Sequence, residues 1–302
     1  MCRKHDEFPL VSVIIPTYNR KTLVLEAVES VLQGTFRDFE LIVADDGSSD
    51  GTVEALLQRG FHSYYSDTPP SESPSPAPPL DRASTSPTGP TLHRYSSSSA
   101  APPLILLPLP HTGFPGLVRN RGARIARGTY LAFLDSDDLW KPQKLELQLK
   151  AHREAFIKGQ RYRISHTREL WIRKGRIVSQ RKQKHRREGD VFQDALKKCI
   201  LGPSTVVMER SLFLESGGFR EDLKIAEDYE LWVRITCFEP VLYLEEPLTV
   251  KRGGFPDQLS QSYPFIEPFR LRALKDLVDR GFFLDRESSL TQGTLPQADR
   301  QK

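Results

Sequence analysis

Two periodicities of apolar residues alternate along the first sixty positions. Residues 10–16, "LVSVIIP", and residues 39–47, "FELIVADDG", contain short apolar runs that are typical of strands buried on both faces of a parallel sheet. Residues 20–34 and 48–60 instead carry apolar side chains at helical spacing, and each segment ends in glycine. The order strand, helix, strand, helix predicts an α/β fold with right-handed crossovers.

The periodicity is lost between about residues 62 and 110. Stretches such as "SESPSPAPP" and "SSSSAAPP" are rich in Pro and Ser. A segment of this composition buries too little apolar surface to offset the entropy of ordering. We therefore predict a disordered insertion at the surface, with a small folded subdomain as the alternative.

Regular patterns resume after the insertion. A helical pattern over residues 118–126 ends at Gly128, and residues 130–134 form a third buried apolar run. Further helices and strands are expected at residues 142–149, 202–208, 210–219, 226–238 and 268–282.

These patterns predict the division of the chain. One domain is expected over residues 8–250, interrupted by the insertion. A helical segment follows at residues 251–284, and the polar residues 285–302 are expected to form a disordered tail.

Composition and charge narrow the function classes. A net charge of +4 on 302 residues is too mild to indicate nucleic-acid binding. The three cysteines lack the spacing of a metal site and indicate a reducing compartment. The sequence has no run of 18 apolar residues and no apolar leader at its start. We therefore expect a cytoplasmic protein without a membrane span.

Residues 158–187 are markedly basic and include "RKQKHRR" at residues 181–187. We expect that piece to be a solvated loop. Two functional alternatives stay open for the basic segment. It could contact an anionic acceptor, or it could make a peripheral contact with an anionic membrane surface, which would place the protein at the inner membrane face.

Polar residues follow three of the predicted strands. They are "PTYN" at residues 16–19, "DDGSSD" at residues 45–50 and "DSDD" at residues 135–138. Because ligands bind outside the carboxyl ends of parallel strands, we expect these residues to meet in one crevice. They could instead be ordinary turn formers. That alternative is weakest for residues 135–138, because three clustered carboxylates repel unless a cation such as a divalent metal ion is bound.

Four segments in order resemble the signature blocks of family 2 glycosyltransferases of the non-processive bacterial type. They are "VSVIIPTYNR", "ELIVADDGSSDGT", "RNRGARIARGTYLAFLDSDDLW" and "GGFREDLKIAEDYELWVRI". The resemblance implies the GT-A fold, a Rossmann-like, mostly parallel sheet flanked by helices. The loop "PHTGFPGLV" departs from the family pattern. The chain also lacks a QxxRW block, which argues against a processive synthase.

The resemblance implies roles in donor binding. Pro16, Thr17 and Tyr18 would hold the base of a nucleoside diphosphate, with Tyr18 stacked on it, and Asp45 would accept a hydrogen bond from a uracil imide. Arg119 and Asn120 stand where the family often contacts the donor, although they could be ordinary residues of a helix surface.

The DxD motif of the family maps to Asp135, Ser136 and Asp137. Asp135 and Ser136 would face the ribose or sugar. Asp137, supported by Asp135, would bind Mg²⁺ or Mn²⁺ at the diphosphate. Asp228 matches the family's general base, although an acid at a helix start also stabilises the helix without any function.

The expected function is the transfer of a sugar from a nucleotide-diphosphate sugar, a UDP-sugar by preference, to the hydroxyl of a glycan or glycolipid acceptor. The reaction would be metal-dependent and inverting, and would serve cell-surface polysaccharide or lipopolysaccharide synthesis. The alternatives are a sugar nucleotidyltransferase, a non-enzymatic carbohydrate- or nucleotide-binding relative, and a phospho-acceptor signalling domain. A nucleotidyltransferase needs a Gly-rich basic loop after the first strand, and "PTYNRKTL" does not provide one.

Overall fold

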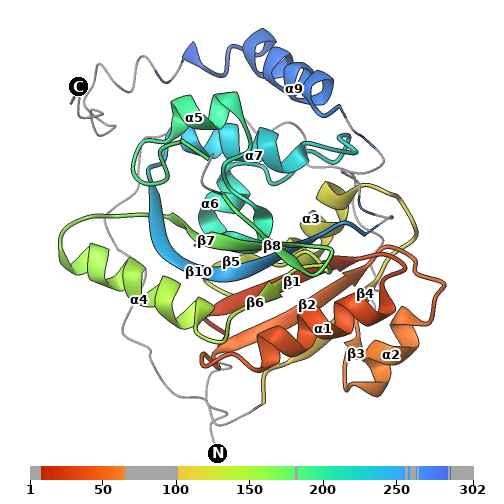
Figure 1. Cartoon of the computed structure of the whole chain (residues 1–302). Helices are drawn as coiled ribbons and strands as arrows, with labels where there is room; N and C mark the ends of the chain where they lie inside the picture. Colours follow the sequence, from red (N-terminus) through yellow and green to blue (C-terminus); the bar gives the residue numbers. More distant parts are fainter. Residues whose placement is uncertain are drawn as a thin grey trace, which may run out of the picture.

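The computed structural model describes residues 8–64, 101–180, 183–255 and 265–284, together with Gln258, Tyr263 and Arg286. Helices cover both faces of one ten-stranded mixed sheet (Figure 1). The described strands are β1 Val11–Thr17, β2 Phe39–Asp45, β3 His62–Ser63, β4 Leu104–Pro108, β5 Tyr130–Phe133, β6 Leu139–Trp140, β7 Ile164–Arg173, β8 Arg176–Val178, β9 Val207–Glu209 and β10 Val241–Gly253. The described helices are α1 Lys21–Leu32, α2 Thr52–Gln58, α3 Pro115–Ile125, α4 Lys144–Ile157, α5 Phe192–Lys197, α6 Arg210–Glu215, α7 Glu227–Thr236 and α9 Glu267–Asp279, with a 3₁₀ helix at Pro203–Thr205.

The strand order is β3-β4-β2-β1-β5-β9-β7-β10-β6, with β8 paired to β7. The first five strands in this order are parallel, and β9 runs antiparallel to β5 and β7. The carboxyl ends of β1, β2 and β5 therefore lie at one edge of the sheet. This is the edge at which the sequence predicted a crevice.

Alternation along β1 divides the core into two layers. Val13 and Ile15 pack with residues of α1, α2 and α4 on one face, while Ile14 packs with residues of α3, α6 and α7 on the other. Strands buried on both faces lack the polar alternation of an exposed sheet, which explains the continuous apolar runs in the sequence. The predicted α/β class is confirmed.

The predicted insertion was drawn too wide at both ends. β3 lies within its first residues, and Leu104–Pro108 forms β4 between β2 and β3, with Leu41 opposite Leu104. The run "LILL" was overlooked because prolines flank it, but proline is tolerated at a strand end. Residues 65–100 lie outside the described residues, so the disorder that we predicted for them stays a prediction.

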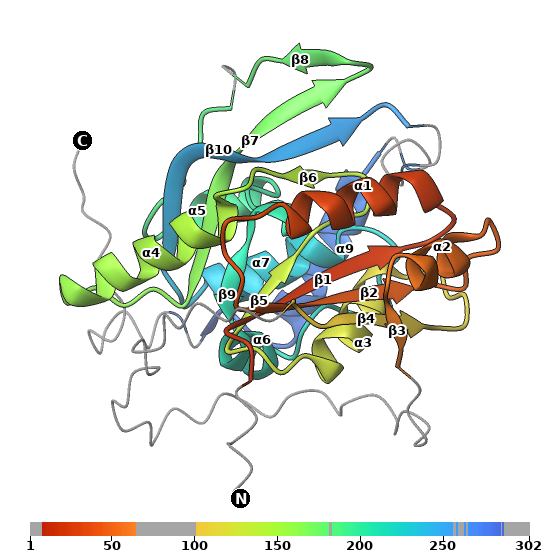
Figure 2. The ribbon, with the colours of Figure 1, turned by 90° about the horizontal axis from the view of Figure 1, so that it is seen from below.

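The basic segment contains a hairpin that the charge pattern concealed. β7 and β8 occupy residues 164–178, and β7 lies between β9 and β10 in the sheet. Only residues 183–187 of the predicted loop are described, and they contain no helix or strand. The hairpin extends to the margin of the molecule (Figure 2).

The predicted domain boundary at residue 250 falls inside a strand. β10 continues to Gly253 and pairs with β7 up to Arg173. The strand was missed because "EEP" interrupts its apolar pattern, at the point where the pairing register with β7 shifts. α9 lies in the segment 251–284, and its Leu277 packs in one apolar cluster with α7. Of the predicted tail, only Arg286 is described.

Candidate functional site

A cavity of about 630 Å³ opens at the carboxyl edge of the sheet. The chain segments that line it come from the end of β1, the loop after β5, α3, the start of α7 and the end of β10. The residues predicted from sequence that line it are Pro16, Thr17, Tyr18, Arg119, Asp135, Ser136, Asp137 and Asp228. Segments that are far apart in the sequence thus meet in one place.

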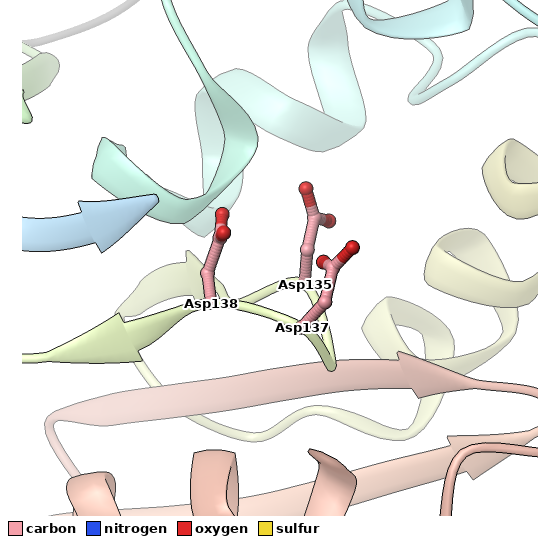
Figure 3. A group of neighbouring side chains, drawn as sticks. All are labelled: Asp135, Asp137 and Asp138. Atoms are coloured by element: carbon pink, nitrogen blue, oxygen red, sulfur yellow. The ribbon is translucent and has the colours of Figure 1, made fainter. Parts of the chain in front are cut away.

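The acidic loop, residues 135–138, follows β5 directly. It is closed by a hydrogen bond from the Asp138 amide to the Asp135 carbonyl, 2.9 Å long. Carboxylate oxygens of Asp135, Asp137 and Asp138 lie within 4.8 Å of one another. All three side chains point to the same side of the loop (Figure 3).

Each carboxylate of the acidic loop has a cation beside it. Arg119 lies 2.6 Å from Asp135, and Arg20 lies 3.1 Å from Asp137. Lys251 lies 3.6 Å from Asp138. The repulsion that we expected within the loop is therefore offset by protein cations, and it does not by itself require a bound metal ion.

The surroundings of the three acids differ. Burial disfavours the charged form of Asp135, but Arg119, Lys251 and Arg20 together outweigh burial and lower the pKa of Asp135. Burial raises the pKa of Asp138 to about 7, against the charge of Lys251, and the neighbouring carboxylates add to the rise. Both oxygens of Asp138 also hold protein donors, Ser204 Oγ at 2.7 Å and the Arg252 amide at 3.0 Å.

The acidic loop fits a hard divalent ion in its donor set, because such ions prefer carboxylate oxygens. Asp138 is the least suited of the three acids, since its oxygens are already engaged. Asp135 and Asp137 therefore stay the candidate ligands, as the sequence predicted.

Arg119 connects the acidic loop to α7. Its guanidinium donates to Asp135 at 2.6 Å and to Glu227 at 2.7 Å, and the residue is 6% exposed. Burial would lower the pKa of Arg119, but the two carboxylates outweigh burial and raise it. Burial raises the pKa of Glu227 to about 7, Arg119 opposes the rise, and the charge of Asp228 adds to it.

Asn120 does not line the cavity. Its amide donates to the Phe219 carbonyl at 2.8 Å, and its Oδ1 accepts from the Phe219 amide at 3.0 Å. These bonds hold the turn before α7 against α3. Gly218 adopts φ of +69° in this turn, and a Cβ there would lie 2.7 Å from Asn120 Oδ1, so this position requires glycine.

Asp228 stands in the first turn of α7 and lines the cavity. The fully buried Leu231 and the 1% exposed Trp232 anchor the helix in the core. Ala226, just before the helix, adopts φ of 65°, in the left-handed region that is unusual for a residue with a Cβ. Cys199 Sγ donates to Asp228 Oδ2 at 3.5 Å.

At the ends of β1 and β2, Thr17 lines the cavity, whereas Asp45, which lies opposite it in the sheet, does not. Two buried polar atoms here have no hydrogen-bond partner within the described chain. They are Thr17 Oγ1 and Asp45 Oδ1. Asp45 is 1% exposed, burial raises its pKa, and its Oδ2 accepts from the Ser48 amide at 2.9 Å. Since buried polar atoms are nearly always paired, these two are suited to a ligand that donates hydrogen bonds.

Several residues around the cavity escaped the sequence analysis. The ring of Tyr18 stacks on His111, with centroids 4.0 Å apart, so one of its faces is already covered. Asp46 lines the cavity and accepts from the Thr112 and Gly113 amides, at 2.9 Å each. Asp46 and Arg20 each lie within a segment quoted in the sequence analysis, which gave neither of them a role of its own. The other overlooked residues are Glu227, Lys251 and Arg252.

The sequence matches the model of the glycosyl transferase family 2 over residues 12–65 and 80–217, more than half of its length. The chain belongs to this family. The geometry above is therefore that of a family 2 glycosyltransferase domain.

Two glycosyltransferases are similar in sequence to this family 2 chain. An uncharacterized glycosyltransferase of Rickettsia felis is 30% identical over 249 residues, 81% of this chain, and the chain spans about a third (33%) of that relative's length. The UDP-Glc:alpha-D-GlcNAc-diphosphoundecaprenol beta-1,3-glucosyltransferase WfgD of Escherichia coli is 28% identical over 229 residues. That match covers 75% of this chain and 69% of WfgD.

Among solved structures, S. aureus TarS (residues 1–349) in complex with UDP-GlcNAc has a TM-score of 0.61 to this family 2 chain at 21% identity. The match covers 92% of this chain and 72% of the TarS chain, and it supports the GT-A fold. No helix in the described part of the chain is long and apolar enough to cross a membrane.

Proposed function

We propose that the chain transfers a sugar from a UDP-sugar to the hydroxyl of a glycan or glycolipid acceptor, with inversion, in the synthesis of a cell-surface polysaccharide. One observation carries the proposal. The acidic loop and Asp228 come from segments about ninety residues apart, yet they line the same cavity. Arg119 links the two segments, because it pairs with Asp135 and with Glu227, the neighbour of Asp228. The names of WfgD, which includes UDP-Glc, and of TarS, in complex with UDP-GlcNAc, support a UDP-sugar donor.

The uracil base would bind at the end of β1. An imide N–H is a donor of the kind that the unpartnered Asp45 Oδ1 lacks, and Thr17 Oγ1 is free to bond the same ring. Tyr18 would stack on the base with the face that His111 leaves open. Pro16 would form the wall of this slot. Asn120 has no part in the donor site that we propose.

Asp137 and Asp135 would hold Mg²⁺ or Mn²⁺, and Asp135 and Ser136 would face the donor ribose or sugar. When bound, a divalent ion neutralises the charge that develops on a leaving diphosphate. Lys251 and Arg252 line the same part of the cavity and add positive charge there.

Asp228 would act as the general base. The acceptor oxygen attacks the anomeric carbon, and the bond from that carbon to the diphosphate oxygen breaks, with its electron pair leaving on the diphosphate. The hydroxyl proton passes to the Asp228 carboxylate. A positioned base contributes about 10²- to 10⁴-fold to such a step.

The acceptor side of the proposal includes the β7–β8 hairpin. Arg173, Lys174 and Arg176 are exposed at its turn, and Arg173 pairs with Gly253, two residues beyond Lys251 at the cavity. Positive charge beside the cavity suits an acceptor that carries phosphate, such as a lipid-linked sugar at the inner membrane face.

A screen of nucleotide sugars for metal-dependent release of the nucleoside diphosphate tests this function. We expect UDP release from a UDP-sugar in the presence of Mn²⁺ or Mg²⁺ and an acceptor glycan. Release of pyrophosphate from UTP and a sugar phosphate would instead indicate a nucleotidyltransferase. Tight UDP-sugar binding without turnover on a panel of acceptors would indicate a binding protein.

A further inference from the structure

Ser204 lies beneath the acidic loop and is fully buried. It belongs to the 3₁₀ helix Pro203–Thr205 and does not line the cavity. Its hydroxyl donates to Asp138 Oδ2 at 2.7 Å and accepts from the Asp135 amide at 3.1 Å. One hydroxyl group thus fastens both ends of the acidic loop.

The carbonyl of Ser204 makes two further connections. It accepts from Trp140 Nε1 at 2.7 Å and from Thr249 Oγ1 at 3.0 Å. Trp140 belongs to β6, which follows the acidic loop, and Thr249 belongs to β10. Ser204 is therefore hydrogen-bonded to β6, which follows the acidic loop, and to β10, which leads to Lys251 and Arg252 at the cavity.

Asp138 extends the connection to the end of β10. Its Oδ1 accepts from the Arg252 amide at 3.0 Å, and its Oδ2, which holds Ser204 Oγ, lies 3.6 Å from Lys251 Nζ. Arg252 Nε in turn donates to the Asp137 carbonyl at 2.5 Å. The third acid of the loop is thus committed to protein donors on both of its oxygens.

We infer that Ser204 and Asp138 form a positioning pair, which holds the Asp135 and Asp137 carboxylates in place and brings Lys251 and Arg252 beside them. Ser204 does not line the cavity and Asp138 does, but the proposed role of both residues is to position the loop, not to bind the donor or the metal. Asp138 is accordingly not a metal ligand, despite its place in the cluster. The inference rests on the proposed function for the role of Asp135 and Asp137 as ligands.

The hydrogen bonds of the pair explain why removing the Ser204 hydroxyl would disturb the Asp135 and Asp137 carboxylates. Ser204→Ala leaves the Asp138 carboxylate and the Asp135 amide without this partner, and buried polar groups that lose a partner rearrange or admit water. The acidic loop would then sample several positions, and two ligands would no longer be held together.

Thr205→Val is the matched control. Thr205 is the next residue, is 1% exposed, and donates its hydroxyl to the Gly202 carbonyl at 2.7 Å. This variant also removes one buried hydroxyl, but the acidic loop keeps its bonds. Both variants are expected to lower the melting temperature by similar amounts.

Mn²⁺ binding to the whole chain, measured from the free-ion signal in electron paramagnetic resonance, tests the inference. We expect Ser204→Ala to weaken Mn²⁺ binding at least fivefold and Thr205→Val to change it less than twofold. Asp138→Asn should weaken binding less than tenfold, and Asp137→Ala at least a hundredfold. Equal Mn²⁺ affinity in Ser204→Ala and Thr205→Val, or an equal loss in Asp138→Asn and Asp137→Ala, overturns the inference.

Crystal structures of the wild type and of Ser204→Ala separate this inference from the proposed function. If the wild type binds no Mn²⁺, the metal in the proposed function fails. The positioning pair is then judged by the acidic loop alone. Displaced or multiple Asp135 and Asp137 side chains in Ser204→Ala support it, and a loop that superposes on the wild type overturns it.

Discussion

Arg119 and Glu227 form an ion pair 2.7 Å long inside the protein, with both side chains less than a tenth exposed (7% and 8%). Because Arg119 also binds Asp135, the pair fixes the distance between the acidic loop and the first turn of α7, where Asp228 stands. The donor side and the acceptor side of the proposed reaction are therefore held together by one guanidinium.

Arg119→Met should lower the free energy of unfolding by about 3–5 kcal/mol, because it leaves buried carboxylates without their cation. Arg124→Met on the same helix is the control. Its ion pair with Glu221 is 3.1 Å long but its side chain is 33% exposed, so the cost should stay below about 1 kcal/mol. Denaturant unfolding measures both. Equal losses would show that the Arg119 pair is no more important than a surface contact.

Asp137→Ala should weaken UDP binding when Mn²⁺ is present and change it little when metal is absent. The physical reason is that Asp137 is proposed to act on the diphosphate only through the ion. Calorimetric titration of UDP with and without Mn²⁺ measures the difference. An equal loss under both conditions would point to a general disturbance of the cavity, and the metal role of Asp137 would be rejected.

Asp228→Asn should reduce turnover at least a hundredfold, while UDP and Mn²⁺ affinity stay near the wild type, because the amide keeps the shape of the side chain and removes its basicity. Glu246→Gln, at an exposed position of β10 that does not line the cavity, is the control. Transfer rates at saturating donor compare the two. Near-normal transfer by Asp228→Asn would contradict the general-base role and leave Asp228 only the role of stabilising the start of α7.

Acid should destabilise the fold through His166. Its Nε2 donates to the Arg187 carbonyl at 2.8 Å, and burial lowers the pKa of His166 to about 4, although this hydrogen bond opposes the shift. Between pH 6.5 and 4 the unfolded chain therefore binds a proton that the folded chain does not. The free energy of unfolding should fall over this range by on the order of 3 kcal/mol from this one group.

His166→Gln tests whether the acid sensitivity comes from His166, because the Gln amide can still donate to the Arg187 carbonyl and does not titrate. Its stability should fall less steeply than that of the wild type between pH 6.5 and 4, as measured by urea unfolding at several pH values. His62→Gln, at an exposed position of β3, should follow the wild type. A parallel fall in all three proteins would assign the acid sensitivity to other groups.

The sequence predicted the elements that bury a continuous apolar stripe or run, such as β1, β2 and α7. It missed β4 and β10, because prolines and acidic residues interrupt their apolar patterns. Both strands nevertheless pair with their neighbours in the sheet, β4 with β2 and β10 with β7. Strand pairing is a property of neighbours in space, and a local pattern does not report it.

The same limit applies to the site. Asp135, Asp137 and Asp228 stand in recognisable motifs, and they do line one cavity. Ser204 and Lys251 have no motif, because their part in the site comes from contacts across the sheet. Asn120 shows the converse case: it stands within a motif, but its side chain is used to hold the turn before α7.

The length of β10 bears on how the site is completed during synthesis of the chain. The hydrogen bond from the Arg252 amide to Asp138 joins residues 114 positions apart, so the acidic loop leaves the ribosome long before Lys251 and Arg252. A nascent or truncated chain ending at residue 250 would contain all four family blocks and still lack Lys251 and Arg252. Such a fragment could be recognised as a glycosyltransferase by every motif it carries, yet its carboxylates would face each other with two cations missing.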